Sequence, residues 1–171
     1  GSTQSVLFYL RELKERGQIR DIPVLIYSPM ATAATEICRK QPGEYDEHSV
    51  GLLKKGLHPF TTSRLRFVQD RYESMKINSI KEPMIIISAS GMLSGGRVLH
   101  HLKHRIGDER NTVLFVGYQP PGSRGDWLKK GSETCRIMGE DIRVRAEIAE
   151  ISGLSAHADK DELLRWCRSC S

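Results

Sequence analysis

The chain has 171 residues, and 39% of them are hydrophobic, which is enough apolar material for one globular domain and excludes a largely disordered segment. Its 26 Lys and Arg residues exceed its 21 Asp and Glu residues, and the net charge of +5 suits a polyanionic partner without requiring one. No apolar run approaches the length of a bilayer span, and the run from Met84 to Ile87 is only strand-sized. We therefore expect a cytoplasmic protein with no membrane segment and no signal peptide.

The four cysteines predict no metal site. Only Cys167 and Cys170 form a close pair, whereas a zinc ribbon needs two such pairs. Cys38 and Cys135 stand alone. Reduced thiols are the favoured interpretation, and a redox role for the close pair is the alternative.

In the first half of the chain, apolar spacing predicts helices around one short strand. Leu7 and Leu10 lie at helical spacing, and Gly17 ends that helix. The predicted elements are a helix over 3–17, a strand over 23–27, a helix over 31–39, a short helix over 48–55 and a longer helix over 62–76.

In the second half, apolar strands alternate with helices. The predicted elements are strands over 83–88, 111–117, 135–138 and 142–151, helices over 97–106, 127–130 and 159–169, and loops over 89–96, 118–126 and 152–158. Almost wholly apolar strands between helices indicate a parallel sheet that is covered on both faces. We therefore expect a Rossmann-like three-layer α/β domain, with a mostly parallel sheet and helices on both faces.

The first candidate site follows the strand over 83–88, because ligands of open parallel sheets gather at the carboxyl ends of strands. Small residues there let backbone N–H groups approach an anion at the start of the next helix, and an arginine could add a charged fork. A tight turn that needs glycine for geometry alone is an equally good interpretation. The candidate residues are Ser88, Ser90, Gly91, Ser94, Gly95, Gly96 and Arg97. They match neither a P-loop nor a dinucleotide-binding loop.

The second candidate is His157, which lies among small residues between a predicted strand and a predicted helix. A histidine there can give or take a proton near neutral pH, and Asp159 could orient it or could simply cap the helix. A lone histidine is more often structural, so its position at a strand end favours a functional role only modestly.

Two further sets of residues carry weaker signals. His100 and His104 share a helix face at metal-binding spacing, but His101 stands where zinc proteases have glutamate, so an ordinary helix face is favoured. Basic residues predict either a solvated surface or salt-dependent contacts with phosphates. They are Arg64, Arg66 and Arg71 on the helix over 62–76, with Lys129, Lys130, Arg143 and Arg145.

Four segments in order resemble a known family. They are Pro23–Ala31, Ser88–Arg97, Val116–Gln119 and Leu154–Asp159. Together they resemble the β-CASP subgroup of metallo-β-lactamase-fold nucleases, and most closely the bacterial RNA-processing members related to the eukaryotic cleavage-and-polyadenylation nuclease subunit. The last two segments at their spacing make the resemblance specific.

The resemblance implies a domain inserted in a hydrolase domain, where it caps a site with two zinc ions and clamps single-stranded RNA in the cleft between the two domains. The metals of such enzymes activate a water that attacks a phosphodiester. His157 would stabilise or protonate the leaving oxygen without binding zinc directly, Ser155 would lie near a phosphate, and the Ser88–Gly96 loop would face the same cleft.

The family's His-x-His-x-Asp-His zinc motif is absent from the sequence. We therefore expect an insert domain over 1–151, a return segment over 152–171 toward a missing metallo-β-lactamase domain, no zinc in this chain and no cleavage by it alone. A stand-alone, non-catalytic nucleic-acid or nucleotide binding module is the alternative, and a mononucleotide-dependent enzyme is disfavoured. A homodimer is compatible with the sequence.

Overall fold

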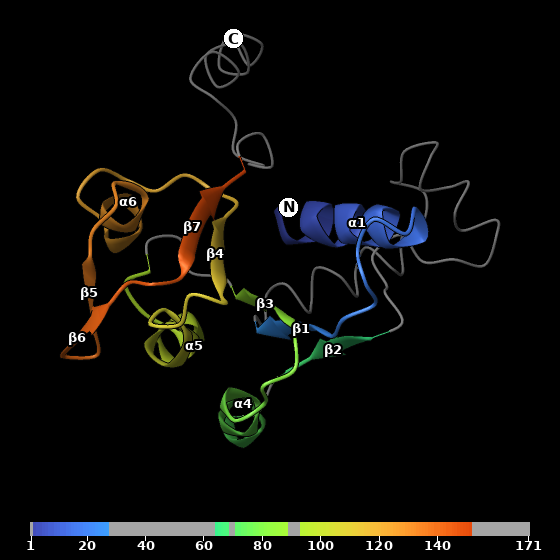
Figure 1. Ribbon diagram of the computed structural model, residues 1–171, viewed down its shortest axis with the longest axis horizontal. Coiled ribbons are helices and arrows are strands. Elements are labelled where there is room, and N and C mark those ends of the chain that lie inside the picture. The colour runs from blue at the N-terminus through green and yellow to red at the C-terminus, as the bar shows by residue number, and fades with distance from the viewer. Residues whose placement is uncertain (1, 28–63, 69–70, 89–92, 152–171) are drawn as a thin grey trace, which may run out of the picture.

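The computed structural model describes residues 2–27, 64–68, 71–88 and 93–151 (Figure 1). The helices predicted over 31–39, 48–55 and 159–169, and the loop over 152–158, lie outside these residues. No helix in the described ranges is long and apolar enough to cross a membrane.

The first half of the chain forms a three-stranded parallel sheet with the order β2-β1-β3. Its strands are β1 (Val24–Tyr27), β2 (Leu65–Phe67) and β3 (Ile85–Ser88). Val24 pairs with Leu65 on one side and with Ile85 on the other. All four residues of β1 are buried, as expected for a central strand covered on both faces.

Alternate residues of β1 enter two separate clusters. Val24 and Ile26 pack with Leu7 of α1 (Ser2–Glu15), whereas Leu25 and Tyr27 pack with Ile77 of α4 (Arg71–Asn78). Figure 1 shows α1 and α4 on opposite sides of the three strands. The predicted helix over 3–17 and the predicted strands over 23–27 and 83–88 are confirmed within one or two residues.

The second half contains α5 (Arg97–Arg105), β4 (Thr112–Phe115), α6 (Arg124–Lys129), β5 (Thr134–Ile137), β6 (Glu140–Arg143) and β7 (Glu147–Glu150). β4 and β7 pair in parallel, and β5 and β6 form an antiparallel hairpin. These elements share the largest described core cluster, which includes Leu102 and Ile106 of the α5 region, Leu128 of α6 and Ile137 of β5.

Two predicted boundaries are wrong. The helix over 62–76 is a strand followed by the shorter helix α4, because Leu65 and Phe67 alternate with polar neighbours and pair with β1. Arg64 and Arg66 therefore belong to the β2 segment and only Arg71 to a helix. Met75 of α4 is exposed. The strand over 142–151 is divided between β6 and β7.

The α/β class with parallel strands is confirmed, but the described strands form three separate sheets. β4 is also less buried than its apolar sequence predicted, because Leu114 and Thr112 are exposed. The predicted turn of helix over 127–130 begins earlier, at Arg124, where the Ser123 side chain accepts a hydrogen bond from the Asp126 backbone N–H.

Helix α5 connects the two halves through a polar stripe at i, i+4 and i+8. Arg97 Nη1 donates to the Val68 carbonyl at 3.0 Å, and Arg105 Nη2 donates to the Ile77 carbonyl at 2.8 Å. Between them, His101 Nδ1 lies 3.2 Å from Asn78 Oδ1. Another face of α5 carries Leu102 into the core of the second half.

Candidate nucleic-acid interface

Ser88 is the last residue of β3 and pairs with Tyr27, the last residue of β1. Its hydroxyl is half-buried and donates to the Tyr27 carbonyl at 3.5 Å. The structure therefore places Ser88 at the shared carboxyl edge of two parallel strands, which is where such sheets bind their ligands.

The described end of the Ser/Gly loop, residues 93–96, leads into α5. Ser94 and Gly96 are exposed, and the space around Gly95 and Gly96 is open at the positions that a Cβ atom would take. Gly96 has φ +82° and is the N-cap of α5, with no side chain capping the first turn. Glycine suits that left-handed conformation, and its lack of a side chain leaves the space beside the turn open.

Arg97, the predicted charged fork, is the first residue of α5. Its bond to the Val68 carbonyl directs one guanidinium nitrogen toward the end of the β2 segment. The described geometry therefore gives Arg97 a structural contact, and its role toward phosphate stays a prediction.

Arg124 of α6 also holds this loop. Its Nη1 donates to the carbonyl of Leu93. Leu93 is buried and has φ +51°, a left-handed conformation that is costly for a residue with a side chain. The loop is thus anchored by an apolar side chain in the core and by an arginine from α6, which the sequence alone did not single out.

Four predicted site residues lie outside the described residues: Ser90, Gly91, Ser155 and His157. For the segment that carries Ser155 and His157, the structure shows only where the described chain ends, at the end of β7. β7 runs parallel to β4, and the Ile151 N–H donates to the Phe115 carbonyl at 2.8 Å. The chain therefore leaves β7 at the sheet edge where β4 continues into Gly117 and Tyr118.

His101 does not form part of a metal site in the described region, where no three His, Cys, Asp or Glu side chains gather. Its ring is buried and packs against Tyr27, with the ring centroids 4.4 Å apart. Burial, reinforced by the charge of Arg105, lowers its pKa from 6.5 to about 4, so the ring is neutral at pH 7. His104, by contrast, is exposed, so the three histidines do not share one environment.

Cys135 is a buried free thiol in the second core, and burial raises its pKa. A protonated, enclosed thiol is a poor nucleophile and a poor metal ligand. This agrees with the reduced, structural role expected for this cysteine.

Sequence reasoning missed a group of residues around the connection from β4 to α6. Tyr118 and Trp127 are two exposed aromatic residues, whereas Gln119 between them in sequence is buried. The available signal was the alternation of aromatic and basic residues from Tyr118 to Lys130, which is typical of nucleic-acid binding surfaces.

Comparison with known proteins agrees with the ordered motifs. Residues 3–128 match the family model of the Beta-Casp domain, and residues 141–171 match that of the Zn-dependent metallo-hydrolase RNA specificity domain. The chain is 38% identical over 144 residues to ribonuclease TTHA0252 of Thermus thermophilus, an alignment that covers 84% of this chain and 33% of the ribonuclease.

Archaeal relatives show the same relation. The chain is 30% identical to the transcription termination factor FttA of Methanosarcina mazei and 33% identical to that of Pyrococcus abyssi, with 98% and 97% of this chain covered. It spans 27% and 26% of these factors, so it corresponds to about a quarter to a third of its relatives. Because the first model covers most of the sequence, the chain belongs to the Beta-Casp family, the family that its motifs resemble.

Proposed function

We propose that the chain is the RNA-clamping domain of a zinc-dependent ribonuclease that hydrolyses phosphodiester bonds, and that it does not cleave RNA alone. The observation that carries the proposal is the succession of the two family models along one chain, the second of them an RNA specificity domain. The similarity to ribonuclease TTHA0252 supports the reaction class.

The described edge of the molecule supports the clamping role. The Ser94–Gly96 turn offers open backbone at the start of α5, and Ser88 lies at the end of the adjacent strand. Backbone N–H groups at a helix start favour a phosphate through hydrogen bonds and the helix dipole. In this proposal, Ser88, Ser90, Gly91 and Ser94–Arg97 contact the RNA backbone, Ser155 lies beside a phosphate, and His157 acts on the leaving oxygen.

Zinc enters the proposal only through a separate domain. The described residues hold no cluster of three potential ligands, so they do not fit a metal centre. We assign the two zinc ions to the metallo-β-lactamase domain that the family pairs with this one. The division into an insert over 1–151 and a return segment over 152–171 belongs to the same proposal, as does a cytoplasmic location.

The test measures binding and cleavage separately. Fluorescence anisotropy of a labelled single-stranded RNA should show binding to the 171-residue chain at 50 mM salt, and weaker binding at 200 mM because phosphate contacts release counterions. The chain alone should leave the RNA intact. No binding at 50 mM salt would overturn the clamping role, and metal-stimulated cleavage by the chain would overturn its inactivity.

The role of His157 needs a longer protein that includes the zinc domain. There, His157→Ala should slow cleavage by about 100-fold or more, the usual contribution of a proton donor, while RNA affinity changes little. An unchanged cleavage rate would remove His157 from the mechanism.

A further inference from the structure

We propose that the connection from β4 to α6 carries a base-stacking site for single-stranded RNA, formed by Trp127 and Tyr118. The proposed site uses residues other than those of the Ser/Gly loop and other than His157. The inference rests on the proposed RNA-binding function and adds to it a named surface that contacts bases rather than phosphates.

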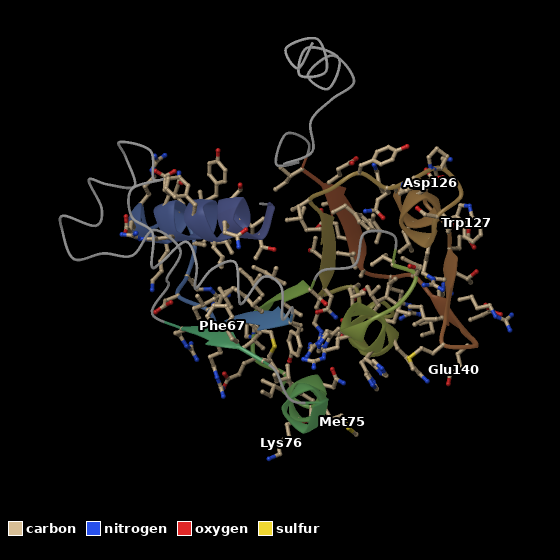
Figure 2. The ribbon with its side chains drawn as sticks, turned by 180° about the vertical axis from the view of Figure 1, so that it is seen from behind. Phe67, Met75, Lys76, Asp126, Trp127 and Glu140 are labelled. Atoms are coloured by element: carbon tan, nitrogen blue, oxygen red, sulfur yellow. The ribbon has the colours of Figure 1, made fainter. Side chains whose placement is uncertain are left out.

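The two side chains are unusually exposed for large aromatic residues. Tyr118 is 71% exposed and Trp127 is 57% exposed. Figure 2 shows Trp127 on the outer side of α6, away from β4 and β7, beside Asp126. Neither ring contributes to the core cluster that α6 enters through Leu128. Burying these rings against a partner would therefore add affinity without disturbing the fold.

The segment that carries the two rings is packed against the start of α6. Gln119 is buried, its Nε2 donates to the Gly117 carbonyl at 3.3 Å, and its side chain lies against the backbone of Gly125. A Cβ on Gly125 would lie only 1.9 Å from Gln119 Oε1, so this contact leaves no spare room. Pro120 and Pro121 complete the connection. Such a preformed surface loses little conformational entropy when it binds.

The charges on α6 and at its end suit a polyanion. Three cations on α6 and at its end, Arg124, Lys129 and Lys130, accompany two carboxylates, Asp126 and Glu150. The carboxylates pair with lysines, Asp126 with Lys130 at 2.8 Å and Glu150 with Lys129 at 2.5 Å. Surface ion pairs of this kind contribute little, so phosphates can replace the carboxylates as lysine partners.

A purely apolar partner would fit this surface less well, because it would remove these lysine–carboxylate pairs from water, and the desolvation penalty of a buried ion pair can exceed its Coulombic gain. Single-stranded RNA offers both components, since its bases have faces that stack on aromatic rings and its backbone carries phosphates. A duplex would keep its bases stacked on one another. The surface therefore favours unpaired RNA.

The first experiment compares substitutions by RNA anisotropy, using an oligouridylate and the 171-residue chain. Trp127→Leu and Tyr118→Leu keep apolar bulk but remove the aromatic ring, so each should weaken binding by about 5-fold to 100-fold, the range measured for one stacked base. Trp127→Phe should restore most of the affinity. Tyr9→Leu is the matched control, because Tyr9 is an aromatic residue of similar exposure on α1.

The second experiment gives a signature that a structural role would not produce. In a Trp166→Phe background, Trp127 is the remaining tryptophan. Its fluorescence should be quenched by oligouridylate with the same dissociation constant that anisotropy gives, and an abasic oligomer of equal charge should quench it much less.

The outcomes separate this inference from the function on which it rests. If the unsubstituted chain binds no RNA, the proposed function fails as well. If the chain binds RNA but Trp127→Leu and Tyr118→Leu bind as tightly as Tyr9→Leu, the stacking site is wrong and the clamping role stands. Equal quenching by the abasic oligomer would also overturn stacking.

Discussion

At the scale of single residues, His101 shows how burial determines protonation. The ring lies between Tyr27 and Asn78, and its Nε2 has no hydrogen-bond partner among the described residues. Placing a proton on it would put a charge in a poorly solvated position, near the cation of Arg105. The folded chain therefore holds a neutral ring that the unfolded chain would protonate at a higher pH.

The consequence is a loss of stability in mild acid. The pKa of His101 is about 4 in the folded chain and 6.5 ordinarily, so the unfolded state binds more protons between these values. The free energy of unfolding should fall by on the order of 2 kcal/mol as the pH drops from 7 to 4. Urea titrations at several pH values measure this. His101→Gln should flatten the profile relative to His104→Gln, an exposed control on the same helix; parallel profiles would contradict the assignment.

Gly96 allows a second test at this scale. Its φ of +82° favours glycine, whereas the neighbouring Gly95 has no such conformation and equally open space. Gly96→Ala should lower the free energy of unfolding by about 1 kcal/mol, and Gly95→Ala by clearly less. Urea unfolding of both variants decides the matter, and equal losses would show that the turn can relax.

At the scale of elements, the contact between Gln119 and Gly125 fixes how the β4–α6 connection meets the start of its helix. The two residues are so close that any added atom on Gly125 must displace Gln119. The same side chain closes the turn by its bond to Gly117. One small residue and one buried amide therefore help to position the start of α6.

Gly125→Ala should consequently destabilise the chain by about 1 to 3 kcal/mol, as overpacked sites do. Gly117→Ala is the control, because a Cβ there would meet nothing within 4 Å. Adding Gln119→Ala to Gly125→Ala should recover part of the loss, since the clash is then removed. Strictly additive effects in urea unfolding would show that the two residues do not interact.

At the scale of the whole molecule, separate cores are connected through α5. Ile26 is fully buried in the first half and Ile137 in the second, and they belong to different clusters. The polar stripe of α5 bonds to the β2–α4 segment, while another face of the helix packs in the second core. We expect this shared helix to make the two halves unfold together.

Ile26→Ala tests that expectation from a distance. It should cost about 2 to 5 kcal/mol. In the Trp166→Phe background, the fluorescence transition of Trp127, in the second half, should shift in urea as far as the far-ultraviolet circular dichroism does. Ile137→Ala is the matched change in the core of the second half, the half that contains Trp127. A fluorescence transition unmoved by Ile26→Ala would mean that the halves unfold independently.

The sequence predicted most elements whose apolar pattern is unambiguous. The run from Val24 to Tyr27 is buried on both faces and could only be a central strand or a core helix, and its length favoured a strand. The prediction of one helix over 62–76 was wrong because the spacing of Leu65 and Val68 fits a helix as well as a strand. Only the pairing of β2 with β1 shows that this segment begins with a strand. The hairpin was missed because Met138 adopts the left-handed conformation beside Gly139, which is uncommon for methionine.

The candidate site was predictable only in part. Ser88 and Gly96 could be located because glycine and serine at a strand end have a direct structural meaning. The bond from Arg124 to the Leu93 carbonyl joins residues 31 positions apart, and no local sequence pattern predicts a contact at that separation. Likewise, the exposure of Trp127 is set by which face of α6 meets the core.

The stripe on α5 has a consequence for how this family could diverge. Arg97 and Arg105 bind backbone carbonyls, and every amino acid supplies the same carbonyl. Substitutions at Val68 and Ile77 would therefore preserve these two bonds as long as the backbone keeps its course. Asn78, by contrast, contributes its side chain to His101, so that pair should change in concert among relatives, whereas the two arginine–carbonyl bonds do not depend on which side chains stand at positions 68 and 77.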